Sequence, residues 1–502
     1  MAEPYYITTA ISYPNGPPHI GHAYEAIAAD AIARFQRAQG RDVLFQTGTD
    51  EHGLKMAQAA RDEGAEPALF AEKMSSIFKA MCDRLDVSYD RFIRTSEPAH
   101  HRASQAIWRA MEARGDLYLG RYEGWYSVRD EAFYTEAELI DGEEGKRSPQ
   151  RTPVEWTAEE SWFFRLSAYQ DRLLAHYAAH PSFIQPDTRR NEVLRFVEGG
   201  LTDLSISRTS FDWGVRVPGH PTHVMYVWLD ALTNYLTGLG YPDGGELFDH
   251  YWPADVHLIG KDVVRFHAVY WPAFLMSAGI ELPRQIYGHG FLLSRGEKMS
   301  KSVGNVVDPF ALADRYGTDA LRYFLLREVT FGQDGSYSHE ALVNRVNAEL
   351  ANSFGNLAQR SLSMVFKNLG GILPEPGEAD EDRGLLDMVR RACRETLPRE
   401  FQKFAFAAGL EAWMAAVFAC NAYIDAAAPW ALRKTDPARM AAVLGTLVVA
   451  IRELAEAVAP VIPGSTAKLI ALIDSGSGGQ PIAQPTPIFP RLELEEAEAA
   501  CA

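Results

Sequence analysis

The first 115 residues alternate short runs of β-branched and aromatic residues with segments whose apolar positions recur at helical spacing. The runs YYITTAISY (5–13) and DVLFQTGTD (42–50) have the composition of buried strands. Between them, the segment from about Ala23 to Ala38 repeats its apolar residues every three or four positions, which predicts a helix. This order of strand, helix and strand predicts a parallel sheet with helices on its faces.

Residues 116 to about 224 interrupt this alternation with aromatic clusters such as YEGWYS and ESWFFRL and with the polar stretch DGEEGKRSPQRTP (141–153). Strands and helices then alternate again through VMYVWLDALTNYL, DVHLIGKDVVRFHAVYWPAFLM and QIYGHGFLL. The pattern therefore predicts an α/β fold: a doubly wound, parallel, Rossmann-type domain (1–115 and 225–290), split by an inserted α+β domain (116–224).

From about residue 345 the strand signals disappear, and long Ala- and Leu-rich periodic segments predict an α-helical bundle over 346–475. A connecting segment over 291–345 precedes the bundle. The tail over 476–502 contains the Ser-, Gly- and Pro-rich run SGSGGQPIAQPTPIFP, which either dangles or lies along another surface.

Composition narrows the class of protein. At 502 residues the chain is long enough for two to four domains. The net charge of −17 disfavours nonspecific binding to nucleic acid, although it leaves room for a local basic groove. We expect a cytoplasmic location, because we find neither an apolar run of membrane length nor a leader segment. The four scattered cysteines, Cys82, Cys393, Cys420 and Cys501, argue against a disulfide framework and a cysteine-built zinc site.

The stretch PNGPPHIGH (14–22) stands where the first strand turns into the first helix. The N–H groups and dipole of a helix N-terminus favour an anion, and this turn is the usual phosphate position in a doubly wound sheet. Gly16 and Gly21 allow a ligand to approach the backbone closely. His19 and His22 are three residues apart and can donate to one phosphate. Two histidines that merely cap a solvent-facing helix remain an alternative.

A second basic motif, KMSKS (298–302), lies in the loop SRGEKMSKSVGNVVDP. Gly296 and Gly304 can act as hinges, and the Asp-Pro pair at 308–309 predicts the N-cap and first residue of a helix. Lys298 and Lys301 can meet a triphosphate as point charges. An ordinary solvated turn is the alternative.

Together, HIGH and KMSKS resemble the signature pair of class I aminoacyl-tRNA synthetases. The blocks AISYPNGPPHIGHAYE, GTDEHG, YVWLDALTNY, IGKDVVRFH, KMSKS, NLAQR and APW resemble those of methionyl-tRNA synthetases, in the same order and over nearly the whole chain. The resemblance implies ATP-dependent attachment of L-methionine to tRNA(Met) through a methionyl-adenylate, with release of AMP and pyrophosphate. It also implies Mg²⁺ as a cofactor.

The resemblance assigns roles to matching residues around the reaction centre. It implies catalytic roles for His19, His22, Lys298 and Lys301. It implies contacts with ATP, including Asp262 on the ribose, for Asn15, Gly16, Gly21, Gly260, Asp262 and Lys301. It implies a methionine pocket, with Asp50 on the ammonium, formed by Ile11, Tyr13, Asp50, Trp228, Leu232, Tyr235, Val263 and His267. Aromatic and aliphatic walls suit a flexible thioether, although ordinary core packing would use the same residue types.

Two further assignments lie outside these sets. Arg208 matches an arginine tied to the active site from the inserted domain, although a surface salt bridge explains it equally well. Asn356, Arg360 and Trp430 match contacts with a CAU anticodon. Asn and Arg can read base edges and an exposed Trp can stack on a base, although a solvated helix face would also carry such residues.

The chain departs from the family pattern in one respect, because no cysteine lies between Cys82 and Cys393. We therefore expect a zinc-free variant. We also expect a monomer, since no tRNA-binding barrel follows the bundle. Three alternatives remain: another enzyme of the class, such as a cysteine, leucine or valine enzyme; a small-molecule nucleotidyltransferase; and a non-catalytic tRNA-binding relative. The short insertion and missing zinc cysteines disfavour the first, the bundle disfavours the second, and the intact motifs disfavour the third.

Overall fold

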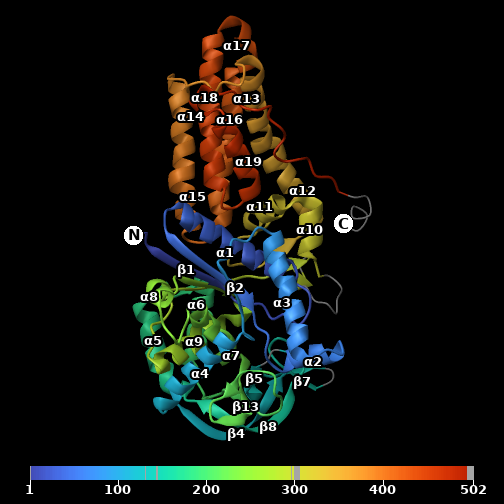
Figure 1. The fold of residues 1–502 in the computed structure, drawn as a ribbon, viewed down its shortest axis with the longest axis vertical. Helices are drawn as coiled ribbons and strands as arrows, with labels where there is room; N and C mark the ends of the chain where they lie inside the picture. The colour runs from blue at the N-terminus through green and yellow to red at the C-terminus, as the bar shows by residue number, and fades with distance from the viewer. Residues whose placement is uncertain (1, 130–131, 143–144, 295–296, 299–305, 495–502) are drawn as a thin grey trace. The chain divides into compact units, whose positions relative to one another are not determined.

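The computed structural model describes residues 2–129, 132–142, 145–294, 297–298 and 306–494 (Figure 1). The chain forms two compact units. The first comprises 1–29, 40–83 and 87–289, and the second comprises 30–39, 84–86 and 290–502.

A six-stranded, fully parallel sheet forms the centre of the first unit. Its order is β3 (Arg91–Arg94), β2 (Asp42–Thr49), β1 (Pro4–Thr9), β14 (Val256–Gly260), β15 (Ile286–His289) and β9 (Ile184–Gln185). The two separated parts of the chain meet where Ile7 of β1 pairs with Val256 of β14. The predicted doubly wound sheet is confirmed. Its edge strand β9 is an addition that the sequence did not predict, because a two-residue strand carries no periodicity.

Helices surround this sheet. They are α1 (Ile20–Ala38), α2 (Leu54–Asp62), α3 (Pro67–Arg84), α4 (Pro98–Ala113), α7 (Val227–Thr237), α8 (Glu246–Tyr251) and α9 (Trp271–Ala278). Helix α1 begins three residues before the predicted Ala23, because the side chain of His19 accepts a hydrogen bond from the backbone of its first turn. The α1 residues of the first unit from Ala26 to Ala29 are buried, as expected for a helix beside the central strands.

The insertion carries antiparallel sheets and two helices. Its main sheet has the order β10 (Leu204–Ser205), β8 (Glu155–Phe164), β4 (Leu117–Ser127) and β5 (Ala132–Tyr134), and β4 pairs with β8 over ten residues. A smaller sheet contains β11 (Ser207–Arg208), β13 (His220–Met225) and β12 (Arg216–Val217). The helices are α5 (Gln170–Ala179) and α6 (Asp187–Glu198). The predicted polar loop contains the hairpin strands β6 (Ile140–Gly142) and β7 (Gly145–Arg147).

The second unit opens with three short strands, β16 (Leu292–Ser294), β17 (Glu297–Lys298) and β18 (Gly335–Tyr337), and the helices α10 (Pro309–Tyr316) and α11 (Thr318–Glu328). The predicted helical bundle follows and is confirmed. It contains α12 (His339–Arg345), α13 (Asn356–Asn368), α14 (Asp380–Arg391), α15 (Leu397–Phe401), α16 (Phe406–Ala427), α17 (Pro429–Thr435), α18 (Pro437–Val458) and α19 (Pro463–Asp474). One run of it, Phe406–Thr435, is apolar and long enough to span a membrane by composition alone, and 44% of its most apolar window is buried within the protein.

The tail after α19 lies along the bundle, which decides between the two alternatives left open by its composition. Ile482 and Phe489 are buried. The side chain of Gln359 on α13 donates to the carbonyl of Pro485 at 3.1 Å. Asn347 exchanges two hydrogen bonds with the backbone of Leu492, at 2.8 and 2.9 Å. The described part of the tail is therefore a strap on the second unit.

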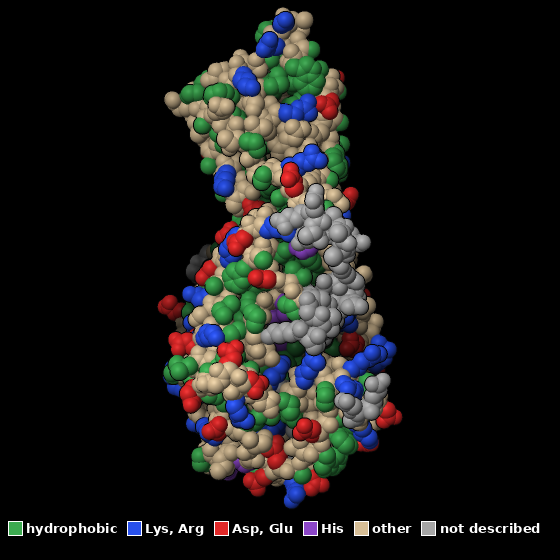
Figure 2. All heavy atoms as spheres, turned by 90° about the vertical axis from the view of Figure 1, so that its right-hand side faces the viewer, with side chains coloured by type: hydrophobic (Ala, Val, Ile, Leu, Met, Phe, Trp, Pro, Cys, Tyr) green, Lys and Arg blue, Asp and Glu red, His purple; other side chains and the backbone are tan. Residues whose placement is uncertain are grey.

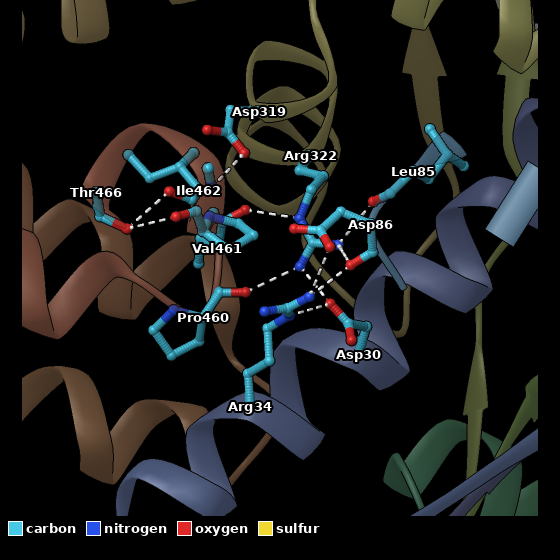
Figure 3. A network of polar contacts seen from close by, with 12 residues as sticks. Asp30, Arg34, Leu85, Asp86, Asp319, Arg322, Pro460, Val461, Ile462 and Thr466 are labelled. Carbon is cyan, nitrogen blue, oxygen red and sulfur yellow. Dashed lines mark hydrogen bonds and ion pairs between the residues drawn. The ribbon is translucent and has the colours of Figure 1, made fainter. Parts of the chain in front are cut away.

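A fully buried arginine connects several segments of the second unit by hydrogen bonds (Figure 3). Arg322 on α11 donates to a carboxylate oxygen of Asp30 on α1 at 2.6 Å and to the carbonyls of Pro460 and Val461 at 2.9 Å. It also donates to the carbonyl of Leu85 at 3.1 Å. One side chain thus joins three segments that are far apart in the sequence.

Candidate active site

A cavity of about 290 Å³ opens at the carboxyl ends of β1, β2 and β14, where doubly wound sheets bind ligands. All eight residues of the predicted methionine pocket line it, together with His22, Gly260 and Asp262. The other lining residues are Ala10, Ser12, Glu25, Lys55, Arg129, Gln150, Val227, Ala231, Asn234 and Phe266. Residues from distant parts of the sequence therefore share one hollow.

Helix α7 supplies one wall. Trp228, Leu232 and Tyr235 are spaced four and three apart and so share a face of the helix. The ring of Trp228 stacks on that of Phe266, with centroids 3.7 Å apart and planes 6° from parallel. This pair makes a flat aromatic surface in the cavity.

Tyr235 and His267 form a hydrogen-bonded pair in the wall. The Nδ1 of His267 lies 3.0 Å from the carbonyl of Val263, which can only accept, so Nδ1 carries the proton. Its Nε2 therefore accepts from the Tyr235 hydroxyl at 2.7 Å. Burial lowers the pKa of His267 to about 4 and raises the pKa of Tyr235 above its usual range. Both groups are therefore neutral at neutral pH.

Tyr13 and Asp50 supply another part of the wall. The Tyr13 hydroxyl donates to the carbonyl of His52 at 2.6 Å and accepts from the backbone N–H of Met56 at 3.2 Å. The backbone N–H of Asp50 donates to the carbonyl of Ser12 at 2.9 Å, and the Asp50 side chain is buried at the cavity. A carboxylate in this position can pair with a ligand cation.

His19 and His22 cap α1 reciprocally. The Nδ1 of His19 accepts from the backbone N–H of Gly21, and the Nδ1 of His22 accepts from the backbone N–H of His19, both at 3.1 Å. Since Nδ1 accepts in each ring, the proton of the neutral imidazole is on Nε2 and can be donated outward. The rings stack with centroids 3.9 Å apart. Capping and anion binding are therefore compatible, because they use different nitrogens.

The predicted ATP-binding residues are only partly gathered at the cavity. Gly260 and Asp262 line it, whereas Asn15, Gly16, Gly21 and His19 lie outside its lining. A Cβ on Gly260 would come within 2.7 Å of the Asp262 carboxylate, so a larger residue there would displace that side chain.

Glu25 was missed by the sequence reasoning. It lines the cavity one turn after His22 on α1, and this i, i+3 spacing was the available signal. Its carboxylate lies 2.9 Å from Nε2 of His289. Burial raises the pKa of Glu25, although the contact with His289 opposes this effect. Lys55, Arg129 and Gln150 were also missed, the last two because they come from the insertion, whose folding onto the site leaves no local pattern.

The KMSKS motif lies largely outside the described residues, which include neither Lys301 nor the expected hinges Gly296 and Gly304. The backbone of Lys298 closes strand β17, paired with Leu293 of β16. The predicted N-cap beyond the loop is confirmed, because the Asp308 side chain accepts from the N–H of Phe310 and α10 begins at Pro309.

Arg208 forms an ion pair, with its Nε 3.7 Å from the carboxylate of Glu159, but this pair is buried and is not the surface salt bridge that was one of its explanations. Its side chain is buried, donates to Ser205 and to the Ser207 carbonyl at 2.9 and 2.5 Å, and lies over the ring of Tyr226. It is absent from the cavity lining. The interactions it makes are thus within the insertion and the segment that follows.

The residues predicted to contact the anticodon lie on the helical bundle. The guanidinium of Arg360 on α13 lies 5.4 Å above the ring of Trp430 on α17 and pairs with Asp425 at 2.9 Å. Asn356 precedes Arg360 by four residues on α13, and its side chain is exposed. Trp430 is 49% exposed. An exposed aromatic beside a cation offers a base both stacking and hydrogen bonding.

Neither the surface charge distribution nor the metal-ligating side chains point to a further site. Figure 2 shows acidic and basic side chains interspersed over the visible face rather than gathered by sign. Among the described residues, no group of three or more His, Cys, Asp or Glu side chains could hold a metal ion. A larger hollow of about 630 Å³, whose lining includes residues of β4, β5 and α6 together with Arg265 and Tyr270, contains none of the predicted site residues.

Comparison with known proteins gives matches over nearly the whole chain. Residues 5–146 and 143–362 match the family described as tRNA synthetases class I (M). Residues 375–484 match the anticodon binding domain of methionyl tRNA ligase.

Individual relatives are similar over their full lengths. A methionine–tRNA ligase of Brucella suis is 58% identical, covering 98% of this chain and 99% of the relative. One of Mesorhizobium japonicum is 59% identical, covering 94% and 91%. The structure of Mycobacterium tuberculosis methionyl-tRNA synthetase in complex with methionyl-adenylate is 56% identical, with a TM-score of 0.94, and the match covers 97% of this chain and all of that one.

Proposed function

Since the chain belongs to the class I methionyl-tRNA synthetases, we propose which of its residues perform each part of the reaction of that family. The reaction is the ATP-dependent attachment of L-methionine to tRNA(Met) through a methionyl-adenylate, with release of AMP and pyrophosphate. We assign residues to each reactant, a place to Mg²⁺ and an oligomeric state to the protein.

Methionine occupies the cavity of about 290 Å³. The observation that carries this assignment is that Ile11, Tyr13, Asp50, Trp228, Leu232, Tyr235, Val263 and His267 all line one hollow. Asp50 pairs with the ammonium group. The thioether lies against the aromatic surface of Trp228 and near the hydrogen-bonded pair of Tyr235 and His267. Apolar walls suit a flexible thioether, and the polar groups of the pair lie near its sulfur.

ATP lies toward the N-terminus of α1. Asp262 binds the ribose, and the backbone at Gly21 and Gly260 allows close approach, together with Asn15 and Gly16. His22 lines the cavity and uses Nδ1 for the capping bond, so its Nε2–H is the donor that we assign to the phosphates. His19 stacks on His22 and acts beside it. Lys298 and Lys301 neutralise the phosphates as point charges.

In the first step, a carboxylate oxygen of methionine attacks the α-phosphorus of ATP, and the bond to the leaving pyrophosphate breaks in line. In the second step, a 3′-terminal ribose hydroxyl of tRNA attacks the methionyl carbonyl, and AMP leaves. No side chain needs to act as a nucleophile. The protein positions the reactants and stabilises the charge that grows on the phosphates.

Mg²⁺ would be held mainly by the phosphates of ATP. Mg²⁺ prefers oxygen ligands and is commonly held by substrate phosphates with few carboxylates. This suits a chain in whose described residues no metal-ligating group of three occurs. The Mg²⁺ supplies counter-charge to the phosphates. We further propose a zinc-free, monomeric enzyme that acts in the cytoplasm without membrane attachment, and light scattering of the purified protein tests the monomer.

Tests at both sites separate the two parts of the proposal. Changing His22 or Lys301 to Ala should lower methionine-dependent ATP–pyrophosphate exchange about 10²- to 10³-fold, by analogy with removal of one preorganised donor. Changing Asn356, Arg360 or Trp430 to Ala should leave exchange intact and weaken charging of a CAU-anticodon tRNA. Unchanged exchange in both the His22 and Lys301 variants would show that the phosphate assignment is wrong.

A further inference from the structure

A buried carboxylate lies behind the wall of the cavity. Asp230 is on α7, two residues from Trp228 and from Leu232, and so points away from the face that lines the cavity. It is fully buried, and its two oxygens accept from Nδ1 of His52 and from Nε2 of His100, both at 2.7 Å. Although burial opposes ionisation, the two imidazoles hold the pKa of Asp230 well below its usual range.

We call the group formed by Asp230, His52 and His100 the clamp. Its His52 side contacts Tyr13 in the cavity wall. His52 is two residues beyond Asp50, and its carbonyl accepts from the hydroxyl of Tyr13 at 2.6 Å. The His52 ring packs edge-to-face on Trp213, with centroids 5.3 Å apart. The indole N–H of Trp213 donates to the carbonyl of Glu51 at 2.5 Å. His52 is therefore bonded to the cavity residue Tyr13 and lies two residues from the cavity residue Asp50, so a shift of His52 would affect both.

The His100 side fixes α7 itself. His100 is on α4, is fully buried, and holds Asp230 through one ring nitrogen. Its other ring nitrogen lies 3.0 Å from the hydroxyl of Thr237, two turns further along α7. Helix α7 is therefore held at two points against α4, while Asp230 ties the same helix to His52.

We propose that Asp230 is a positioning residue for methionine, which fixes the spacing between the α7 wall and the wall formed by Tyr13 and Asp50. The inference rests on the proposed use of the cavity for methionine. Asp230 does not line the cavity, so it acts through the residues it holds. Fully satisfied buried polar networks rigidify a site, and a shift of about 1 Å in a positioning group can cost roughly 10²-fold in rate.

Asp230→Asn is the first variant to test. It keeps the shape and one acceptor oxygen, and a change of tautomer in one histidine accommodates the new N–H, so the fold should persist. We expect the KM for methionine in pyrophosphate exchange to rise about 10-fold or more. The KM for ATP should stay within about twofold, because the residues that the clamp holds belong to the methionine pocket.

Conservative variants separate positioning from general destabilisation. His52→Asn retains an N–H donor near the place of Nδ1 and should keep the KM for methionine close to that of the parent, whereas His52→Ala should behave like Asp230→Asn. His176→Gln changes a partly buried histidine on α5, away from the clamp, and should leave both KM values unchanged. Tyr13→Phe combined with Asp230→Asn should raise the KM by less than the product of the single effects, because both act on the same wall.

A Trp228→Ala variant distinguishes failure of this inference from failure of the methionine assignment. If Trp228→Ala raises the KM for methionine and Asp230→Asn does not, the cavity is still the methionine site, but the clamp has no positioning role. If neither changes it, the cavity is not the methionine site. If Asp230→Asn lowers only kcat, in proportion to the loss of folded protein, its role is structural and the inference is overturned.

Discussion

The imidazole of His19 lies over the backbone of Gly21, and the two residues are fitted to one another. The N–H of Gly21 donates to Nδ1 of His19 at 3.1 Å. A Cβ on Gly21 would come within 2.8 Å of Cε1 and 2.9 Å of Nδ1 of that ring. Gly21 is therefore required by the packing of His19, in addition to any approach of phosphate.

Gly21→Ala should impair amino-acid activation through this contact. The added methyl group displaces the His19 ring, which stacks on His22. Overpacking of this kind costs about 1 to 3 kcal/mol, so if the strain is relieved at the expense of the phosphate contacts, kcat/KM for ATP in pyrophosphate exchange should fall about 5- to 150-fold.

A second glycine provides the control for this change. Gly384 lies within α14, and a Cβ there would meet no atom within 4 Å. Gly384→Ala should therefore leave exchange unchanged and raise the free energy of unfolding by about 0.5 to 1 kcal/mol. Equal exchange rates in the two variants would mean that the His19 ring has no part in activation.

Trp430→Ala should weaken tRNA charging without affecting activation. An exposed aromatic that stacks on a base contributes about 1 to 3 kcal/mol, which corresponds to a loss of about 5- to 150-fold in kcat/KM for tRNA. Phe418→Ala is a matched control, because Phe418 lies on the same bundle and is 53% exposed, close to the 49% of Trp430. A similar loss in both variants, or any loss in exchange, would contradict a specific contact of Trp430 with the anticodon.

The buried His267 should make folding sensitive to acid. The folded protein keeps this imidazole neutral down to its pKa of about 4, whereas in the unfolded chain it takes up a proton below about pH 6.5. The unfolded state therefore binds more protons in this window, and the free energy of unfolding should fall by about 3 kcal/mol as the pH drops from 6.5 to 4.

His267→Gln removes this group, so its free energy of unfolding should decline less steeply over the same range. Urea unfolding of both proteins at several pH values measures the difference. Parallel pH profiles would show that His267 is not kept neutral by its burial.

Periodicity and the order of segments along the chain predicted the sheet and the bundle, whereas the residues of the cavity came from the resemblance to methionyl-tRNA synthetases. The same reasoning missed Glu25, whose burial depends on His289 more than 260 residues away. It also missed Asp230, since a carboxylate within an apolar helix becomes interpretable only when His52 and His100 are seen beside it. Pairings between distant polar side chains leave no periodicity, so the structure was needed to find them.

Arg322 is the clearest case of such a pairing in the second unit. It donates to Asp30 and to backbone carbonyls at Leu85, Pro460 and Val461 (Figure 3). Both Arg322 and Asp30 have fully buried side chains. Removing Arg322 leaves the buried carbonyls without this donor and leaves Asp30 with Arg34, at 2.8 Å, as its ion-pair partner, so the loss is strongly destabilising.

Arg322→Met should therefore lower the free energy of unfolding by about 3 to 5 kcal/mol. Arg383→Met, which breaks the exposed ion pair with Asp380, should cost less than about 1 kcal/mol. Hydrogen exchange measured by mass spectrometry should show faster exchange at 30–39 and 84–86 in Arg322→Met alone, because those segments lose their common partner. If the two variants unfolded at the same urea concentration, Arg322 would contribute no more than a surface charge, and the joining of the three segments would have to come from apolar packing alone.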